Sequence, residues 1–311
     1  MYRIGVDIGG TGIQAGLVNR EGQILGQKEC STDTAGGFLK VIEDIKQLVY
    51  GLLETLQLTA DQIERLGFGV PSCINQKGQV TCVNLGWKEV DFLDTLKEAF
   101  PEFSVAAEND ATVAAVAEAK FGSMKGYPYS ILLTLGTGVG GGIIIDGKPF
   151  VGAHGVGSEI GHMVIGENFY DCNCGNNGCF ETFCSATAIL KYTKKLLEEG
   201  RTSSLVAACD GDMNRLNAKK VFEAYRLGDE VAIESIQRFK CYLAMGITAL
   251  INCIDPHVIA IGGGVSRAGD IILDGLEEEI RKYALYKKEE FAKIVIATLG
   301  NEAGIIGAAF L

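Results

Sequence analysis

Residues 2–18 read YRIGVDIGGTGIQAGLV, and this stretch gives the clearest indication of the fold. An apolar run that ends at Asp7 is interrupted by closely spaced glycines, and a second apolar run, Ile13–Val18, follows them. This pattern predicts a strand, a glycine loop and a strand. The same arrangement returns at residues 130–145, which read SILLTLGTGVGGGIII. The sequence therefore predicts a duplicated architecture.

The composition is that of an ordinary globular protein. The chain has 311 residues, of which 47% are hydrophobic and 22% charged, and this length is typical of roughly two domains. Its 28 Lys and Arg against 39 Asp and Glu give a net charge of −11 without any basic cluster. Nucleic acid and anionic membranes are therefore not expected as partners. We expect any polyanionic ligand to be held by backbone amides, helix ends and metal ions.

Neither a membrane segment nor a disulfide framework is expected. No apolar run approaches the roughly 18 residues of a transmembrane helix, and the N-terminus opens into a strand pattern rather than a signal peptide. We therefore expect a cytoplasmic protein whose ten Cys are kept reduced. Four of these Cys fall between residues 172 and 184, which indicates a metal site.

Apolar periodicity around the two glycine loops predicts an α/β protein. The expected helices cover residues 38–58, 110–121, 188–199, 231–254, 270–283 and about 302–311, and the expected strands include 66–70, 105–107, 258–261 and 294–297. No flexible linker interrupts the chain, so we expect a hinge near residues 122–128. The expected domains are a smaller one of residues 1–121, on which the helix at 302–311 packs, and a larger one of residues 122–301.

Both glycine loops have the composition of a phosphate-binding turn, because glycine lets backbone N–H groups approach phosphate oxygens closely. The first comprises Gly9, Gly10 and Thr11, and the second Gly136, Thr137, Gly138 and Gly140. Either loop alone also fits a tight β-turn, but their equivalent places favour phosphate binding. The second loop matches GxGxxG, yet residues 143–145 are isoleucines and predict a strand where a dinucleotide-binding unit requires a helix. No P-loop sequence occurs.

Three thiols and one imidazole form the ligand set of a closed zinc site. The expected ligands are His162, Cys172, Cys174 and Cys179. Four protein ligands leave no position for water, so the zinc is expected to be structural and to hold a loop that has few apolar residues. Cys184 is close enough in sequence to be a rival ligand. The alternative is a set of reduced thiols without metal.

Two carboxylates are candidates for phosphoryl-transfer chemistry. Asp110 follows a strand and lies at a helix start, where it is either the carboxylate that accepts a hydroxyl proton or simply the N-cap of the helix. Asp7 is either a partner of hydrated Mg²⁺ or a strand-end residue that bonds to its own turn.

Several motifs together resemble the ROK family, which contains repressors, open reading frames and sugar kinases. The residues that carry the resemblance are Asp7-Ile-Gly-Gly-Thr11, Glu108-Asn-Asp110, Leu135-Gly-Thr-Gly-Val-Gly-Gly-Gly142, Glu159-Ile-Gly-His162 and Cys172-Asn-Cys-Gly-Asn-Asn-Gly-Cys-Phe-Glu181. The resemblance runs from residue 2 to near the C-terminus and is most specific at the Cys-rich segment. It implies the two-domain actin-like (ribonuclease H-like) ATPase fold with a cleft between the domains.

Within the family the chain is most similar to the bacterial glucokinases. This implies transfer of phosphate from ATP to the primary hydroxyl of a hexose, with Mg²⁺, in a cytoplasmic homodimer that acts in glycolysis. Asp110 is then the base, and Asp7 and the glycine loops hold the nucleotide. The implied sugar contacts are Asn84, Asn109, Asp110, Glu159, His162 and Glu181, and the implied adenosine turn is Gly262, Gly263 and Gly264. His162 would bind zinc through one ring nitrogen and face the sugar with the other.

Some features of the sequence leave alternatives open. Gly12 stands where many family members have Lys, and Ser72 follows Pro71 where Gly is usual. Trp87 is either core or near the sugar, and Gly262–Gly264 also fits a plain strand-to-helix turn. The preferred hexose is open among glucose, mannose, N-acetylmannosamine, fructose and allose, as is polyphosphate as a donor.

Two rival functions follow from the same motifs. A sugar-responsive repressor of this family would carry an extra N-terminal DNA-binding domain. Asp7 lies only six residues from the start of this sequence and the net charge is −11, so we do not expect DNA binding. A sugar sensor without turnover is the second rival, and the presence of Asp110 argues against it.

Overall fold

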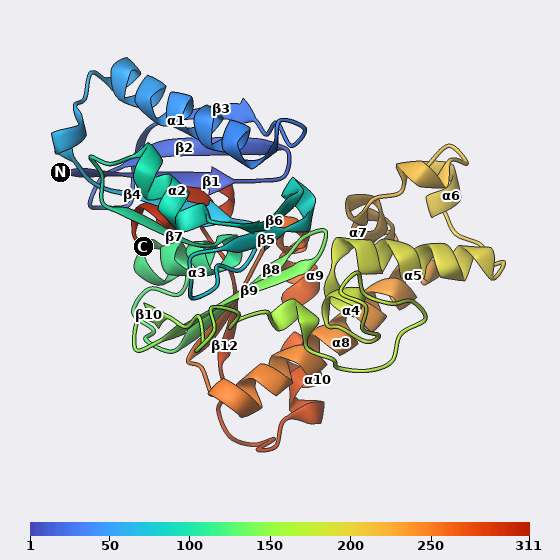
Figure 1. Cartoon of the computed structure of the whole chain (residues 1–311). Helices are drawn as coiled ribbons and strands as arrows, with labels where there is room; N and C mark the ends of the chain where they lie inside the picture. The colour runs from blue at the N-terminus through green and yellow to red at the C-terminus, as the bar shows by residue number, and fades with distance from the viewer. The chain divides into compact units, whose positions relative to one another are not determined.

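A computed structural model describes all residues from 1 to 311 (Figure 1). It divides into two compact units. Unit 1 comprises residues 1–128, 142–158 and 298–311, and unit 2 comprises residues 129–141 and 159–297. No helix is both long and apolar enough to cross a membrane.

Unit 1 is built on a five-stranded sheet. Its strands are β1 (Tyr2–Ile8), β2 (Gly12–Val18), β3 (Ile24–Ser31), β4 (Ile63–Val70) and β7 (Val105–Asn109), in the order β3-β2-β1-β4-β7. The first three strands form an antiparallel meander, and β1, β4 and β7 run parallel. The strand, glycine loop and strand expected at residues 2–18 are therefore confirmed.

The helices of unit 1 are amphipathic or buried. They are α1 (Gly37–Leu56), α2 (Phe92–Ala99), α3 (Asp110–Phe121) and α11 (Ala303–Ala309), and a small hairpin joins β5 (Val80–Cys82) to β6 (Trp87–Val90). Helix α1 contributes Val41, Ile45 and Val49 to the core, because a spacing of four residues places them on one face. The hairpin and α2 carry few apolar residues in a regular pattern and were not expected from the sequence.

Helix α11 lies against β1, β4 and α3 at very short range. A Cβ at Gly5 would overlap with the carbonyl of Ile305, and a Cβ at Gly67 would overlap with the carbonyl of Ala308. Glycine at these two strand positions therefore lets the helix backbone touch the sheet. This close approach places the last residues of the chain in the same unit as the first.

The far end of α3 is fixed by Glu118, which is fully buried. Its carboxylate accepts hydrogen bonds from the backbone N–H and hydroxyl of Ser123 at 2.7 and 2.9 Å. It also accepts bonds from the backbone N–H groups of Thr298 and Leu299 at 2.8 and 2.7 Å. A buried carboxylate is tolerated where several donors satisfy it, so this one ties α3 to the segment that leads into α11.

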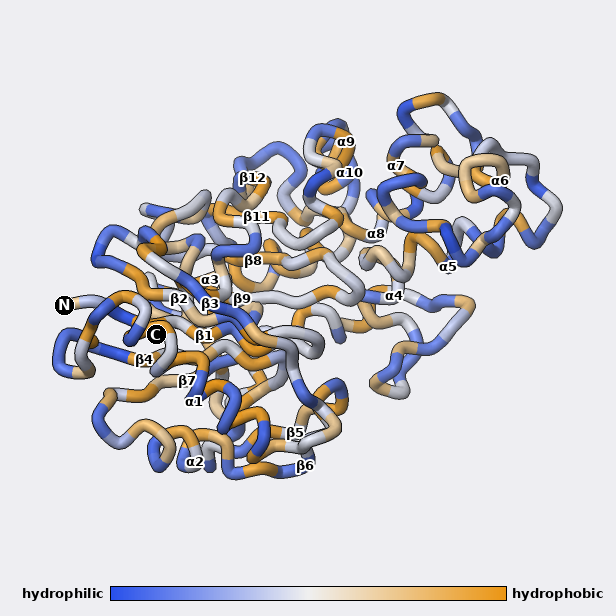
Figure 2. The backbone as a smooth tube through the Cα atoms, turned by 90° about the horizontal axis from the view of Figure 1, so that it is seen from above, coloured by the Kyte–Doolittle hydropathy of each residue, from blue (hydrophilic) through white to orange (hydrophobic).

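The second sheet repeats the strand order of the first. The second sheet contains β8 (Ser130–Leu135), β9 (Val139–Ile145), β10 (Lys148–Pro149), β11 (Val258–Gly262) and β12 (Lys293–Ile296), in the order β10-β9-β8-β11-β12. Figure 2 shows the apolar runs along β8 and β11. Strand β9 directly follows the glycines, so the rejection of a dinucleotide-binding unit is confirmed. Gly140 lies inside β9 rather than in the loop.

The helices of unit 2 surround the long helix α8 (Glu230–Ile254). The others are α4 (Glu181–Cys184), α5 (Ala186–Glu198), α6 (Leu205–Ala208), α7 (Ala218–Arg226), α9 (Asp270–Leu273) and α10 (Leu276–Tyr283). The single helix expected at 270–283 is wrong, because Gly275 has a φ of 66° and breaks it in two. Short 3-10 helices cover Ala60–Gln62, Val83–Leu85, Ile160–His162, Met213–Arg215, Gly264–Ala268 and Gly300–Glu302.

The compact units differ from the domains expected from the sequence. Residues 142–158 belong to unit 1, whereas the sequence analysis assigned them to the second domain. The physical reason is that the chain leaves unit 2 within β9 and returns only at Glu159, a path that local periodicity does not encode. The two units are consequently of similar size, and unit 1 is not the smaller part expected.

Candidate active site

Three parallel strands of unit 1 end in a row of polar groups. The strand register pairs Asp7 of β1 with Gly69 of β4, and Gly69 with Glu108 of β7. Neighbouring strands are about 4.8 Å apart, so these two acidic residues lie on the same edge, roughly 10 Å from backbone to backbone. Burial raises the pKa of both carboxyls. Ligands of open α/β sheets bind at this carboxyl edge.

The expected base lies at the same edge. Helix α3 begins at Asp110, and its N-cap is Asn109, whose Oδ1 accepts hydrogen bonds from the backbone N–H groups of Ala111 and Thr112 at 3.0 and 3.1 Å. The alternative that Asp110 is the N-cap is therefore wrong. Asp110 Oδ1 accepts a hydrogen bond from the N–H of Ala111 at 2.7 Å. The helix N-terminus favours the ionised carboxylate, which is the form that a base requires.

Capping changes what Asn109 can offer to a ligand. Its side-chain oxygen is occupied by the helix, so the Nδ2 group is the part that can contact a substrate, as a hydrogen-bond donor. The sequence predicted a partner for the sugar at this residue without indicating which atom would serve. The N-cap geometry decides it.

A cavity of about 700 Å³ opens beside the first glycine loop. Its lining includes Asp7, Gly9, Thr11, Gln14, Glu29 and Asn301. No Lys, Arg or His lines it, so backbone amides and polar side chains would face an anionic ligand there. Gln14, Glu29 and Asn301 were not predicted, because nothing in local spacing shows that residue 301 returns to β1.

The second glycine loop is fixed by the start of α5. The N–H of Ala186 donates to the carbonyl of Gly136 at 2.8 Å, and the hydroxyl of Thr187 donates to the carbonyl of Thr137 at 2.7 Å. Both bonds use loop carbonyls, whereas the N–H of Gly136 donates within the loop to the carbonyl of Gly138 at 2.9 Å, so the N–H groups of Thr137 and Gly138 are the ones that can face a ligand. Phosphate recognition uses N–H donors of this kind.

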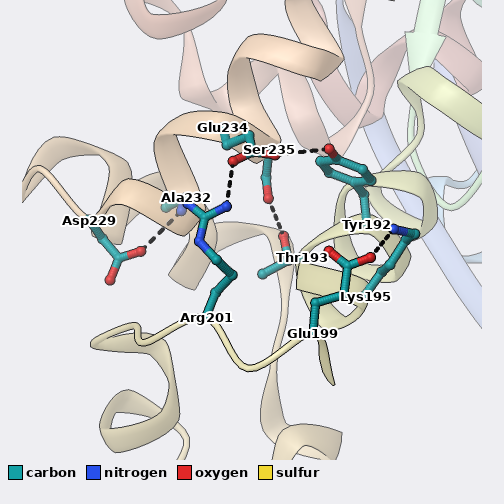
Figure 3. Close-up of polar contacts among 9 residues, drawn as sticks. All are labelled: Tyr192, Thr193, Lys195, Glu199, Arg201, Asp229, Ala232, Glu234 and Ser235. Carbon is teal, nitrogen blue, oxygen red and sulfur yellow. Dashed lines mark hydrogen bonds and ion pairs between the residues drawn. The ribbon is translucent and has the colours of Figure 1, made fainter. Parts of the chain in front are cut away.

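Helix α5 is in turn held on α8, as Figure 3 shows. The buried hydroxyl of Thr193 bonds to that of Ser235 at 3.0 Å, and Tyr192 donates to Glu234 at 3.1 Å. Arg201 also bonds to Glu234, at 2.9 Å. The loop at residues 136–138 therefore rests on two packed helices.

The glycines at the end of β11 lie beside the second loop. Gly263 has a φ of 81°, and a Cβ there would clash with the backbone of Leu135 at the end of β8. Only glycine fits this place without a shift. Gly264 borders a cavity of about 370 Å³ that is also lined by Lys219, Phe222 and Arg226 of α7. The turn therefore has a cavity beside it, which a plain strand-to-helix turn does not require.

The four expected zinc ligands come together in unit 2. One ligand atom from each of His162, Cys172, Cys174 and Cys179 lies within 4.8 Å of all the others. The Sγ atoms of Cys174 and Cys179 are 3.5 Å apart, and His162 Nδ1 is 3.6 Å from Cys172 Sγ. A tetrahedral ion with Zn–S bonds of about 2.3 Å has sulfur–sulfur edges of roughly 3.8 Å. The cluster therefore fits zinc.

The thiols of the cluster differ in pKa. A hydrogen bond from the backbone N–H of Asn176 lowers the pKa of Cys174 to about 7, towards the thiolate form that binds metal, whereas burial raises the pKa of Cys172 and Cys179. The rival ligand Cys184 is excluded from the cluster. Its thiol is fully buried and lies 3.8 Å from the carbonyl of Phe239 on α8.

The implied sugar contacts of unit 2 surround this cluster. His162 directs Nδ1 at Cys172, and its Nε2 lies 3.8 Å from a carboxylate oxygen of Glu159. Glu181 lies 3.0 Å from the sulfur of Cys172, and a Cβ at Gly138 would overlap with its carboxylate. The structure therefore brings Glu159, His162 and the zinc ligands together and places Glu181 beside the second glycine loop.

An asparagine network holds the cysteine-rich loop independently of the thiols. Asn177 Oδ1 accepts a hydrogen bond from the N–H of Asn168 at 2.8 Å, and its Nδ2 donates to the carbonyl of Asn168 at 2.9 Å. Asn168 and the hydroxyl of Tyr170 both donate to the carbonyl of Thr182, at 2.8 and 2.7 Å. Arg238 bonds to Asn168 at 2.9 Å. This network was not predicted, since isolated Asn residues do not form a recognisable sequence motif.

Asn84 and Trp87 lie in unit 1. Asn84 is exposed in the 3-10 helix Val83–Leu85, where its side chain is accessible to a ligand. Trp87 is buried, with its ring centroid 5.0 Å from that of Phe38 and 5.7 Å from that of Phe92. Of the two places considered for Trp87, the structure supports the core.

Known proteins are similar to this chain over its full length. The model of the ROK family matches residues 3–311. The chain belongs to the ROK family. The glucokinase of Halalkalibacterium halodurans is 36% identical over all of this chain and 94% of its own length. The glucokinase of Thermotoga maritima is 34% identical over 98% of this chain and 95% of its own length.

A solved ROK structure shows the same fold. The ROK family glucokinase from Streptomyces griseus, in complex with glucose and AMPPNP, superposes with a TM-score of 0.83 at 32% identity. The match covers all of this chain and 98% of that chain. The two-domain actin-like fold expected from the resemblance is therefore confirmed.

Proposed function

We propose that this protein transfers the terminal phosphoryl group of ATP to the primary hydroxyl of a hexose, and that the hexose is glucose. The observation that carries the proposal is the acidic edge of unit 1. Asp110 directly follows strand β7. The neighbouring strand β4 pairs with β7 on one side and, at Gly69, with Asp7 of β1 on the other. Phosphoryl transfer to an alcohol needs a carboxylate that accepts the hydroxyl proton and a second group that organises the metal–nucleotide complex. Full-length similarity to named glucokinases supports the choice of glucose.

The proposed nucleotide contacts follow the glycine-rich turns. Gly9, Gly10, Thr11, Gly136, Thr137 and Gly138 would line the phosphates. The N–H groups of Gly10, Thr11, Thr137 and Gly138 would be the donors, since those of Gly9 and Gly136 bond within their own loops. Gly262, Gly263 and Gly264 would contact the adenosine. The cavity beside Gly264 supports the second assignment, since it gives an adenosine a place to lie. Asp7 would hold the hydrated Mg²⁺ of the nucleotide, which supplies charge neutralisation at the β- and γ-phosphates.

The proposed hexose contacts combine donors and acceptors. Asn84 and Asn109 would donate hydrogen bonds to the sugar. Glu159, Glu181 and His162 would form hydrogen bonds with neighbouring sugar hydroxyls. Asp110 would bond to the attacking hydroxyl, orient its oxygen towards the γ-phosphorus and take its proton as the new P–O bond forms. The leaving ADP then carries the electrons of the broken P–O bond.

Zinc would have a structural part in this scheme. Its proposed ligands are the thiolates of Cys172, Cys174 and Cys179 and the Nδ1 atom of His162, which leaves Nε2 of His162 for the substrate. The ion would fix a loop that the asparagine network holds only at Asn168, Asn177 and Thr182. As expected from the family resemblance, we also propose a homodimer in the cytoplasm.

The test is an assay of ADP release over a panel of hexoses. We expect the highest kcat/KM with glucose, lower values with mannose, N-acetylmannosamine, fructose and allose, and no ADP release without sugar. The Asp110→Asn variant is the matched control for contaminating kinases. The proposal of glucose is wrong if another hexose gives the higher kcat/KM, and the proposal of a kinase is wrong if no hexose stimulates release of ADP. In the latter case, calorimetric binding of a hexose would identify a sensor.

A further inference from the structure

Ser158 has a backbone conformation that residues with a Cβ rarely adopt. Its φ is 73°, in the left-handed region, where a residue with a side chain is less stable than glycine by roughly 1 kcal/mol. It directly precedes Glu159, and the chain passes from unit 1 to unit 2 between these two residues. An unfavourable conformation persists only where the surrounding structure stabilises it.

The stabilising contact is made by the side chain of Ser158 itself. Its hydroxyl donates a hydrogen bond to the carbonyl of Phe150 at 2.9 Å. One residue earlier, the N–H of Gly157 donates to the carbonyl of Val151 at 2.8 Å. These two adjacent bonds close residues 150–158 into a loop whose ends are joined. A glycine at position 158 would adopt the same φ but could not make the first bond.

The tip of this loop is anchored as well. The side-chain amide of Gln76 donates to the carbonyl of Ala153. Gly155 approaches the carbonyl of Ile74 so closely that a Cβ there would overlap with it. With the tip attached to residues 74–76 and the base closed by Ser158, the backbone of the loop is fixed up to Ser158.

The first side chain after the loop is that of Glu159. It is exposed, and its carboxylate lies 3.8 Å from Nε2 of His162. We infer that Ser158 is a positioning residue for Glu159: its hydroxyl stabilises the left-handed turn that directs this carboxylate towards the hexose. The inference rests on the proposed function, in which Glu159 contacts the sugar. If Ser158 relaxed to negative φ, the peptide that carries Glu159 would rotate.

Three variants of the full-length protein test this inference. In Ser158→Ala the Cβ remains and the hydroxyl is lost, so we expect the turn to relax and glucose affinity to fall about tenfold by calorimetry. Ser158→Gly loses the same hydroxyl but adopts positive φ without cost, and we expect its glucose affinity to stay within about threefold of wild type. Glu159→Gln removes the carboxylate and should itself weaken glucose binding. In all three variants, KM for ATP and zinc content should be unchanged.

The double variant Ser158→Ala/Glu159→Gln decides whether Ser158 acts through Glu159. If it does, the double variant binds glucose no more weakly than Glu159→Gln alone. Additive losses would overturn the inference, as would unchanged glucose affinity in Ser158→Ala, equal losses in the Ala and Gly variants, or a parallel loss of ATP affinity. If Glu159→Gln binds glucose like wild type, the proposed sugar contact fails instead. The two failures are therefore distinguishable.

Discussion

The start of helix α3 and the cysteine-rich loop present their polar groups in opposite ways. Asp110 follows a strand of the central sheet of unit 1, and its helix is capped by Asn109 and tied at the far end by Glu118. The regular structure of the segment from Glu159 to the start of α4 consists of two isolated bridges, Val164–Cys179 and Asp171–Asn177, and the 3-10 turn Ile160–His162. The four potential metal ligands lie in this segment. One region is held by hydrogen bonds and packing that need no ligand. In the proposed function, the other gains part of its order from a metal ion.

The two regions should therefore respond differently when a side chain is changed or the ion is removed. Groups fixed by a sheet and a helix stay in place when a neighbouring side chain is changed, because many small packing contacts and hydrogen bonds together hold them. Groups fixed by one ion lose their positions together when that ion leaves, since its binding free energy is also the folding free energy of the loop. Changes at α3 should therefore act on chemistry, and changes at the cluster should act on hexose binding.

The largest expected effect is that of Asp110→Asn. The amide cannot accept the hydroxyl proton, and general-base catalysis contributes roughly 10²- to 10⁴-fold. We expect kcat to fall by that factor while Tm, zinc content and glucose affinity change little. Steady-state kinetics with calorimetry on the same sample provides the measurement. Activity within tenfold of wild type would show that another group accepts the proton.

Removal of the metal should give the next largest effect. We expect Cys174→Ser to lose zinc and to raise KM for glucose by at least about tenfold, with KM for ATP within about twofold, because the ordered loop is worth several kcal/mol. Metal analysis and kinetics measure both quantities. Cys253→Ser is the matched control, since this thiol is exposed and lies outside the cluster. Equal losses for glucose and ATP would point to general unfolding and would break the comparison.

Asn109 has two roles, as the N-cap of α3 and as a proposed sugar contact, and substitutions can separate them. Asn109→Ala removes the N-cap and should destabilise the fold by about 1 kcal/mol. Asn109→Asp keeps a capping oxygen but loses the Nδ2 donor, so we expect near-normal stability with weaker glucose binding. Urea unfolding and calorimetry distinguish these outcomes. If both variants bind glucose like wild type, the amide of Asn109 does not contact the sugar.

The smallest effect concerns the stability contribution of Asp7. Burial raises the pKa of its carboxyl, so the ionised form is less stable in the folded protein than in the unfolded chain. This loss of folding stability is absent below the pKa that the Asp7 carboxyl has in the unfolded chain. It is fully present above the pKa of the carboxyl in the folded protein. We therefore expect Asp7→Asn to raise Tm near pH 7 and to leave it unchanged near pH 3, while kinase activity is lost. A lower Tm at neutral pH would contradict this assignment.

Much of the candidate site follows from short stretches of sequence. The glycine loops, the start of α3 and the four cluster residues were all expected at the positions where the structure has them. Each depends on neighbours within about a dozen residues, where spacing and residue type already determine which groups can meet. The residues that were missed, Asn301 at the first glycine loop and Arg238 behind the cysteine-rich loop, come from distant parts of the chain.

The elements and the ligand types could be derived from the amino-acid order, because periodicity, turn residues and thiol spacing act over a few residues. The amino-acid order predicted the duplicated strand–loop–strand, the α/β class and a closed zinc ligand set. The tertiary structure alone decided that Asp7 and Glu108 share one edge and that the last helix joins the first strand. It also decided that Ser158 adopts positive φ. These features depend on strand register and on close backbone contacts between segments far apart in the chain, which local patterns do not specify.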